Sequence, residues 1–124
     1  MITLIEKAVR DYLTEQIEEP VFLEEPETYR NPAEPNQKRC SFVVIDKTGS
    51  SIAQHMIKRA TIAVQSYADT KYEASVLNEL VKAIMLNMIV ESDICKVELI
   101  SDYPFPKTET NQPRYQAVFE ITYY

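Results

Sequence analysis

The chain has 124 residues and a mass of 14.3 kDa, and its 19 acidic and 13 basic residues give a net charge of −6. This length, with 45% hydrophobic residues, predicts one globular domain that needs neither a metal nor a disulfide to fold. The negative charge argues against general nucleic-acid binding, which needs clustered Lys and Arg, and no apolar run reaches the roughly 20 residues that span a bilayer.

The N-terminal segment predicts a helix over residues 3–18, because apolar residues recur there at helical spacing. Thr3 and Glu6 form a capping-box pattern at its start. The charges within this segment are not typical of a signal peptide, so we expect synthesis in a cytoplasm. A short extended piece, "VFLEE", follows, and the three prolines of residues 25–39 predict a long loop.

Two strands are predicted next, joined by a hairpin across "TGSSIAQH". The run "CSFVVIDK" lacks clean alternation, which indicates burial on both faces. The run "MIKRATIAVQSYA" alternates well. It places one set of residues on one face (Ala60, Ile62 and Val64) and another set on the opposite face (Thr61, Ala63, Gln65 and Tyr67).

Gly49, the only glycine of the chain, lies in that hairpin segment. A phosphate-binding loop needs several backbone N–H groups, usually more glycines, a helix start and a following lysine. Here Lys47 precedes the glycine and a strand follows it. We therefore predict a turn at Gly49, with a backbone conformation that other residues resist.

Residues 69–91 carry the strongest helical signal. Thr70 and Glu73 form a second capping box. The apolar stripe of this helix predicts a core face, with a partner-helix site as the alternative. Its members are Tyr72, Val76, Leu77, Leu80, Val81, Ile84, Met85 and Met88.

Two more strands, "CKVELISDY" and "RYQAVFEITYY", complete the chain, joined by an extended loop at residues 104–113. In the last strand, one face is predicted to carry Tyr115, Ala117, Phe119, Ile121 and Tyr123. The elements together predict a single-domain α+β fold over residues 1–124. We expect a mixed, mostly antiparallel sheet of four to five strands packed against two α-helices.

The reactive side chains do not form a recognisable catalytic or metal-binding motif. Cys40 and Cys95 lie far apart in the sequence, and with His55, the only imidazole, they are too few for a zinc site. We expect no cofactor, no metal and no enzymatic activity. The alternative is a small enzyme that uses His55 as a base.

Tyrosines gather near the predicted loops and the last strand, where protein interfaces favour them. Candidate interface residues are Tyr29, Arg30, Phe105, Arg114, Tyr115, Tyr123 and Tyr124. Ordinary strand packing and surface loops without a partner are the alternative for these residues.

Several segments together resemble the small tail-terminator and head–tail joining proteins of tailed phages and prophages of Gram-positive bacteria. They are "MITLIEKAVRDYL", "SFVVIDKTGSS", "ATIAVQSYADTKYEASVLNELVKAIM" and "VELISDYPF…RYQAVFEITYY". The resemblance covers most of the chain but includes no catalytic motif. It implies a homo-oligomeric ring, typically six-fold, in the virion between the tail tube and the capsid connector.

The resemblance also implies that DNA passes through the ring without specific binding. Acidic side chains would keep DNA from adhering to such a lumen, and our candidates are Glu18, Glu19, Glu24 and Glu25. An ordinary solvated face followed by a polar loop is the alternative for these residues. A non-viral adaptor or binding module remains an alternative to the phage role. The sequence does not distinguish a terminator from a head–tail joining protein.

Overall fold

The computed structural model describes residues 2, 4–24, 41–54, 57–106 and 112–124. Two helices and five strands follow one another in the predicted order: α1 (Ile5–Gln16), β1 (Val21–Phe22), β2 (Phe42–Gln54), β3 (Ile57–Tyr67), α2 (Lys71–Leu86), β4 (Ile94–Pro104) and β5 (Arg114–Tyr123). A 3₁₀ turn, η1 (Asn87–Val90), extends α2. The predicted α+β fold class is therefore confirmed.

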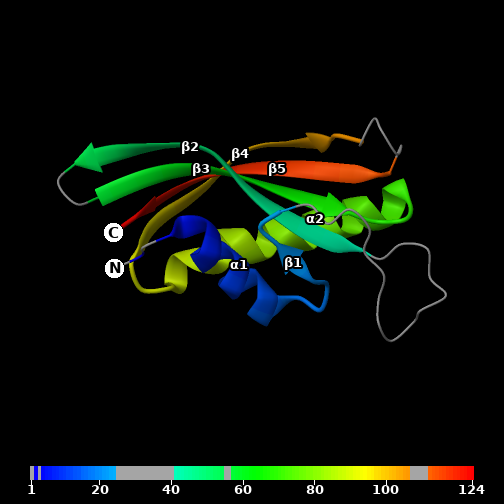
Figure 1. Ribbon diagram of the computed structural model, residues 1–124, viewed down its shortest axis with the longest axis horizontal. Coiled ribbons are helices and arrows are strands. Elements are labelled where there is room, and N and C mark those ends of the chain that lie inside the picture. Colours follow the sequence, from blue (N-terminus) through cyan, green and yellow to red (C-terminus); the bar gives the residue numbers. More distant parts are fainter. Residues whose placement is uncertain (1, 3, 25–40, 55–56, 107–111) are drawn as a thin grey trace.

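The strands form one sheet in the order β1-β2-β3-β5-β4. Only the short β1 pairs in parallel, and every other pair is antiparallel. Both helices lie in one layer beneath the sheet, and the chain ends marked N and C lie side by side (Figure 1). Backbone bonds from Ile2 to Tyr124 and from Tyr124 to Asp93 hold these segments together.

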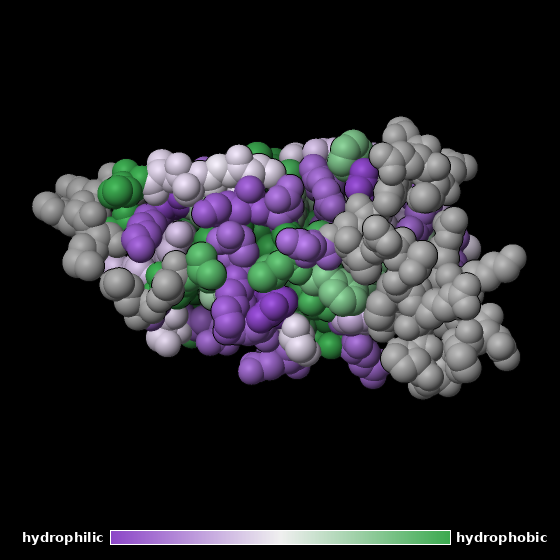
Figure 2. Space-filling view, viewed as in Figure 1, coloured by the Kyte–Doolittle hydropathy of each residue, from purple (hydrophilic) through white to green (hydrophobic). Residues whose placement is uncertain are grey.

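The core lies between the sheet and the helix layer. Its largest fully buried members on the two sides are Ile5, Val9, Leu13 and Met85 from the helices and Ile45, Ile62, Phe119 and Ile121 from the strands. The predicted faces of β3 and β5 are confirmed, since Ala60, Ile62 and Val64 join this core with alternate residues of β5. Hydrophilic residues cover much of the face on which α1 lies, with apolar residues visible between them (Figure 2).

The first helix starts later than the sequence predicts. Its N-cap residue is Leu4, which makes no side-chain capping bond. Thr3 lies outside the described residues. Glu6 instead extends toward β2, where its Oε1 lies 3.7 Å from Nζ of Lys47. The second cap is confirmed, because the Thr70 hydroxyl accepts a bond from the Glu73 backbone N–H at 3.1 Å.

Gly49 does not form the turn that the sequence predicts. It lies within β2 and pairs with Thr61 of β3, next to a register shift after Lys47. Its φ is not positive, and a Cβ at this position would meet no atom within 4 Å. The reason for the error is the length of the hairpin: β2 continues to Gln54, so strand covers most of the expected connection. A glycine beside a β-bulge is common in such strands.

The stripe of α2 is only partly a core face. Leu77, Val81, Met85 and Met88 are buried, and Ile84 packs partly against the core. Tyr72, Val76 and Leu80 are 78%, 52% and 44% exposed, so the prediction is wrong for these three residues. These three residues are spaced four apart, so they share one side of the helix, and that side is not the one that carries the buried residues. The helix thus carries apolar residues on two faces, and only one of them packs on the sheet.

No helix within the described residues is long and apolar enough to cross a membrane.

Candidate functional site

Three of the predicted interface residues lie together where β4 ends and β5 begins. Phe105 follows the last residue of β4, and Arg114 and Tyr115 open β5. Pro104 pairs with Tyr115 in the ladder between these strands. Tyr29 and Arg30 lie outside the described residues, as do residues 107–111 of the predicted loop at 104–113.

Arg114 is held in place by its neighbours. Its Nε donates to the carbonyl oxygen of Phe105 at 2.6 Å, and the Phe105 backbone N–H donates to the carbonyl of Arg114 at 2.7 Å. The guanidinium carbon lies 4.3 Å from the centroid of the Phe105 ring, within range of a cation–π contact. The two residues therefore brace each other, and their side chains are not unattached arms.

Tyr67 supports the same guanidinium from β3. Nη1 of Arg114 donates to the Tyr67 hydroxyl at 2.7 Å, and the guanidinium carbon lies 5.3 Å from the centre of the Tyr67 ring. The Tyr67 ring stacks on Phe42 with 4.5 Å between centroids. Tyr67 is fully buried, so this side of the guanidinium has a rigid platform.

Side-chain amides continue the network across the helix-free face of the sheet. The Tyr67 hydroxyl also donates to Oε1 of Gln65 at 3.3 Å, and the Gln65 amide donates to Gln116 at 2.9 Å. The Gln116 amide then donates to the Tyr103 hydroxyl at 2.6 Å, and the Tyr103 ring meets Phe105 edge-on. The contacts form a closed circuit over β3, β5 and β4.

A cleft of about 410 Å³ adjoins this network. Its walls are Lys71, Pro104, Pro106, Pro113, Arg114 and Tyr115. The two charged side chains among these described residues are basic, although the chain as a whole is acidic. Neither Lys71 nor Arg114 forms an ion pair with a carboxylate within the described part of the chain. The cleft is therefore a local site of positive charge with apolar walls.

The other two predicted interface residues lie at the opposite end of β5. Tyr123 is only 7% exposed and belongs to the core, where burial, with a smaller contribution from the charge of Glu6, raises the pKa of its phenol. Strand packing, which the sequence left as the alternative, accounts for it. Tyr124 is exposed, and its hydrogen bond with the Cys95 thiol raises the pKa of the Tyr124 phenol.

The predicted lumen glutamates surround β1. Glu18 and Glu19 lie between α1 and β1, and Glu24 follows β1 by two residues. Glu18 and Glu24 are exposed and Glu19 is half-buried. Glu25 lies outside the described residues. Whether these side chains line a channel depends on the assembled ring, so that role stays a prediction.

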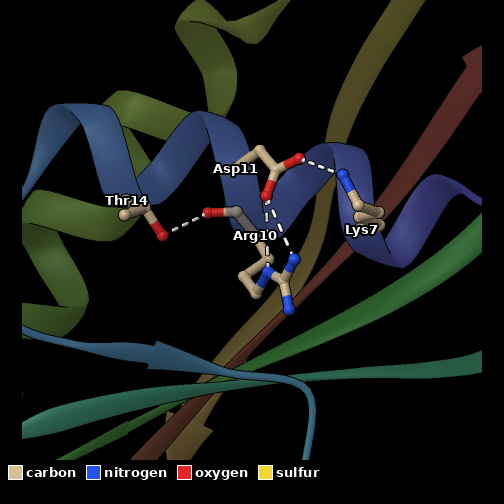
Figure 3. A network of polar contacts seen from close by, with 4 residues as sticks. All are labelled: Lys7, Arg10, Asp11 and Thr14. Atoms are coloured by element: carbon tan, nitrogen blue, oxygen red, sulfur yellow. Dashed lines mark hydrogen bonds and ion pairs between the residues drawn. The ribbon is translucent and has the colours of Figure 1, made fainter.

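A second polar cluster lies on the solvent side of α1 (Figure 3). Lys7 donates to Asp11 at 2.8 Å, one helical turn apart, and the Arg10 guanidinium contacts the other oxygen of Asp11. The hydrogen bond from Lys7, helped by Arg10, lowers the pKa of the Asp11 carboxyl. Thr14 donates to the carbonyl of Arg10 at 2.7 Å. These are contacts within one helix, and they account for the charges without a ligand.

The polar residues between α2 and β4 form a third cluster. Asp102 accepts bonds from Asn78 at 3.2 Å and from Lys82 at 3.0 Å, and Lys82 also contacts Glu79 at 2.7 Å. Bonds to Glu79 and Asp102 raise the pKa of Lys82. Asn78 is buried, and its Oδ1 has no hydrogen-bond partner among the described residues. The cluster ties α2 to the edge strand.

Of the three residues considered for catalysis or metal binding, the structure describes only Cys95. His55 and Cys40 lie outside the described residues, and Cys95 is a half-buried free thiol. Within the described ranges, no three His, Cys, Asp or Glu side chains gather in a way that could hold a metal ion. The absence of enzymatic activity stays a prediction.

Sequence reasoning did not identify Tyr67, Gln116 and Lys71 as parts of this site. The alternation of β3 does place Gln65 and Tyr67 on one face, and that signal is correct. The pairing of β5 with β3, which brings Arg114 opposite Tyr67, has no local signal in the sequence. A comparison with family models finds no match, and no curated protein matches the chain.

Proposed function

We propose that this protein is a structural component of tailed-phage particles. It forms a homo-oligomeric ring at the head–tail junction, six-fold as in the proteins that it resembles, where it caps or completes the tail tube and joins it to the capsid connector. Its partners are further copies of itself, the tail-tube protein and the connector proteins. The sequence resemblance supplies the phage context, and one feature of the sheet supports the assembly.

That feature is a pair of open strand edges. β4 is the last strand on one side, and its outer edge pairs with no described residue. On the other side, β1 pairs only with Val43 and Val44, so the edge of residues 45–54 of β2 that faces away from β3 has no strand beside it in the described part of the chain. Open edges present unpaired N–H and C=O groups that can pair with another chain.

The directions of the strands favour head-to-tail addition. β2 is antiparallel to β3, β3 to β5 and β5 to β4, so β2 and β4 run in opposite directions. A second copy in the same orientation can therefore place its β2 against β4 as an antiparallel pair, which two strands form readily. Repeated with a constant rotation, such a heterologous contact closes into a ring.

Electron microscopy after disruption of the gene tests the role in the particle. Particles made by the source phage or prophage should have tails of uncontrolled length if the protein is a terminator. Separate heads and normal-length tails would indicate a joining role. Normal infectious particles would contradict the proposal and favour an adaptor outside the virion.

A further inference from the structure

We propose that the basic cleft beside Arg114 binds the acidic segment around β1 of a neighbouring copy, through the glutamates Glu19 and Glu24. The inference rests on the proposed ring and names the contact that sets the spacing of its subunits. Each copy then contributes a basic cleft on one side and an acidic segment on the other, as a heterologous interface requires.

The first support is the state of the Arg114 side chain. A half-buried guanidinium has lost part of its hydration and is normally compensated by a carboxylate or another anion. Here its hydrogen bonds go to two neutral oxygens, those of Phe105 and Tyr67. They use Nε and Nη1, and Nη2 makes no hydrogen bond within the described residues. The guanidinium is thus oriented in advance, and a carboxylate is the partner that its planar set of N–H donors fits best.

The second support is the position of the two surfaces in the sheet. Pairing connects Val21, Val43, Ser66, Tyr115 and Pro104 across the five strands. The next row connects Phe22, Val44, Gln65, Gln116 and Tyr103 in the same way. β1 and the end of β4 are therefore the two ends of the same rows. Head-to-tail addition of a copy brings β1 of one subunit toward the cleft of the next.

The third support is charge complementarity. Glu19 and Glu24 flank β1, each two residues away from it, and neither forms an ion pair within the described residues. Among the residues that the structure describes, the charged side chains that line the cleft are Lys71 and Arg114. Opposite charges on matching surfaces fix the register of an association and penalise wrong orientations.

Sedimentation velocity of the purified protein in low salt tests the contact. Lys71→Glu is a suitable change, because Lys71 is exposed at the first position of α2, where a negative charge is tolerated by the helix dipole. We expect half-assembly to need a protein concentration at least about ten times higher than in the wild type. Lys7→Glu, an exposed position in the first turn of α1 and outside both strand edges and the cleft, is the matched control and should assemble normally.

Charge exchange makes the test specific. Glu24→Lys alone should weaken assembly in the same way, and Lys71→Glu with Glu24→Lys should restore it in part. A ring that forms equally well in the wild type and in Lys71→Glu would overturn this contact and leave the proposed function intact. A wild type that stays monomeric at every concentration would contradict the self-assembly itself, and the contact with it.

Discussion

Arg114 and Phe105 hold each other by two hydrogen bonds, one from the guanidinium and one between their backbones, and by one ring contact. Nε of Arg114 donates to the Phe105 carbonyl at 2.6 Å, and the guanidinium lies 4.3 Å from the Phe105 ring. Although both residues lie at strand ends next to a proline-rich connection, their backbones are also bonded to each other. Arg114 lines the basic cleft, and Phe105 holds its side chain in place there.

Removing the guanidinium should destabilise the fold as well as the cleft. Arg114→Met keeps much of the apolar stem but loses the bonds to Phe105 and Tyr67. Hydrogen bonds that involve a charged group contribute about 1.5–3 kcal/mol, so we expect a loss of that size in the free energy of unfolding by urea. Arg59→Met is the control. Its exposed ion pair with Glu120 should contribute less than about 1 kcal/mol. Equal effects of the two changes would contradict the bracing role of Arg114.

The contributions of the buried and the exposed apolar face of α2 to stability can be compared by replacing one leucine on each face. Leu77 is buried in the core and Leu80, three residues later, is 44% exposed. Leu77→Ala should lower the free energy of unfolding by about 2–5 kcal/mol, because it leaves a cavity. Leu80→Ala should lower it by less than about 1 kcal/mol. If Leu80→Ala were the more costly change in the isolated protein, the orientation of the helix would be wrong.

Gly49 should be replaceable, because its backbone is ordinary strand and a Cβ meets no neighbour. Gly49→Ala reduces the freedom of the unfolded chain and should stabilise the protein by about 0.4–1 kcal/mol. Thermal unfolding measures the effect, with Ser50→Ala at the next exposed position of β2 as the control. A clear loss of stability would show that the position needs glycine, as the sequence alone suggested.

The stability of the protein should fall above about pH 10. Burial raises the pKa of Tyr12 and Tyr123 above the usual 10.0, and bonds to Glu79 and Asp102 raise the pKa of Lys82 above 10.5. The unfolded chain releases these protons first, so stability that is present below these values is lost as the pH rises through the folded-state values.

Tyr12→Phe tests this pH dependence. The change removes the bond from the Tyr12 hydroxyl to the Ile84 carbonyl and should cost about 1 kcal/mol at neutral pH. Because the variant has one fewer group to ionise, its free energy of unfolding should decline less steeply between pH 9 and pH 11. Parallel curves for the variant and the wild type would show that Tyr12 does not contribute.

Lysine on either open strand edge should block ring assembly, and the pairs of variants that still associate show which edges meet in the ring. Ile52 of β2 and Ile100 of β4 are exposed, and lysine at a strand edge disfavours pairing with another chain. Ile52→Lys and Ile100→Lys should each abolish rings in native mass spectrometry. Each variant keeps one intact edge, so an equal mixture should form dimers of one copy of each. Val90→Lys on the exposed 3₁₀ turn is the control. Dimers of Ile52→Lys with itself would contradict head-to-tail pairing.

The sequence predicts the fold class and the element order correctly because its periodicities are local. Alternation along β3 and β5 places Ile62, Val64, Phe119 and Ile121 in the core, as the structure has them. Spacing alone could not show which apolar face of α2 is buried, because Tyr72 and Leu77 each begin a series of apolar residues at helical spacing. The position of the sheet decides which of the two faces is covered.

The candidate site depends on strand order, which the sequence does not specify. Phe105 and Arg114 can be singled out by residue type, but their contact requires β4 to pair with β5. The bond between Arg114 and Tyr67 requires β5 to lie beside β3. The pairing of β5 with β3 joins segments that are distant in the chain, so no local pattern predicts it. A glycine such as Gly49 likewise gives no measure of how far a hairpin extends.

The most direct test of the central claim is a cryo-electron microscopy reconstruction of the neck of the phage particle whose genome encodes this chain. The account predicts a closed ring of copies between the tail tube and the connector, with β4 of each subunit beside β2 of the next and the basic cleft against the neighbouring β1. A neck in which every density belongs to other proteins would contradict the account.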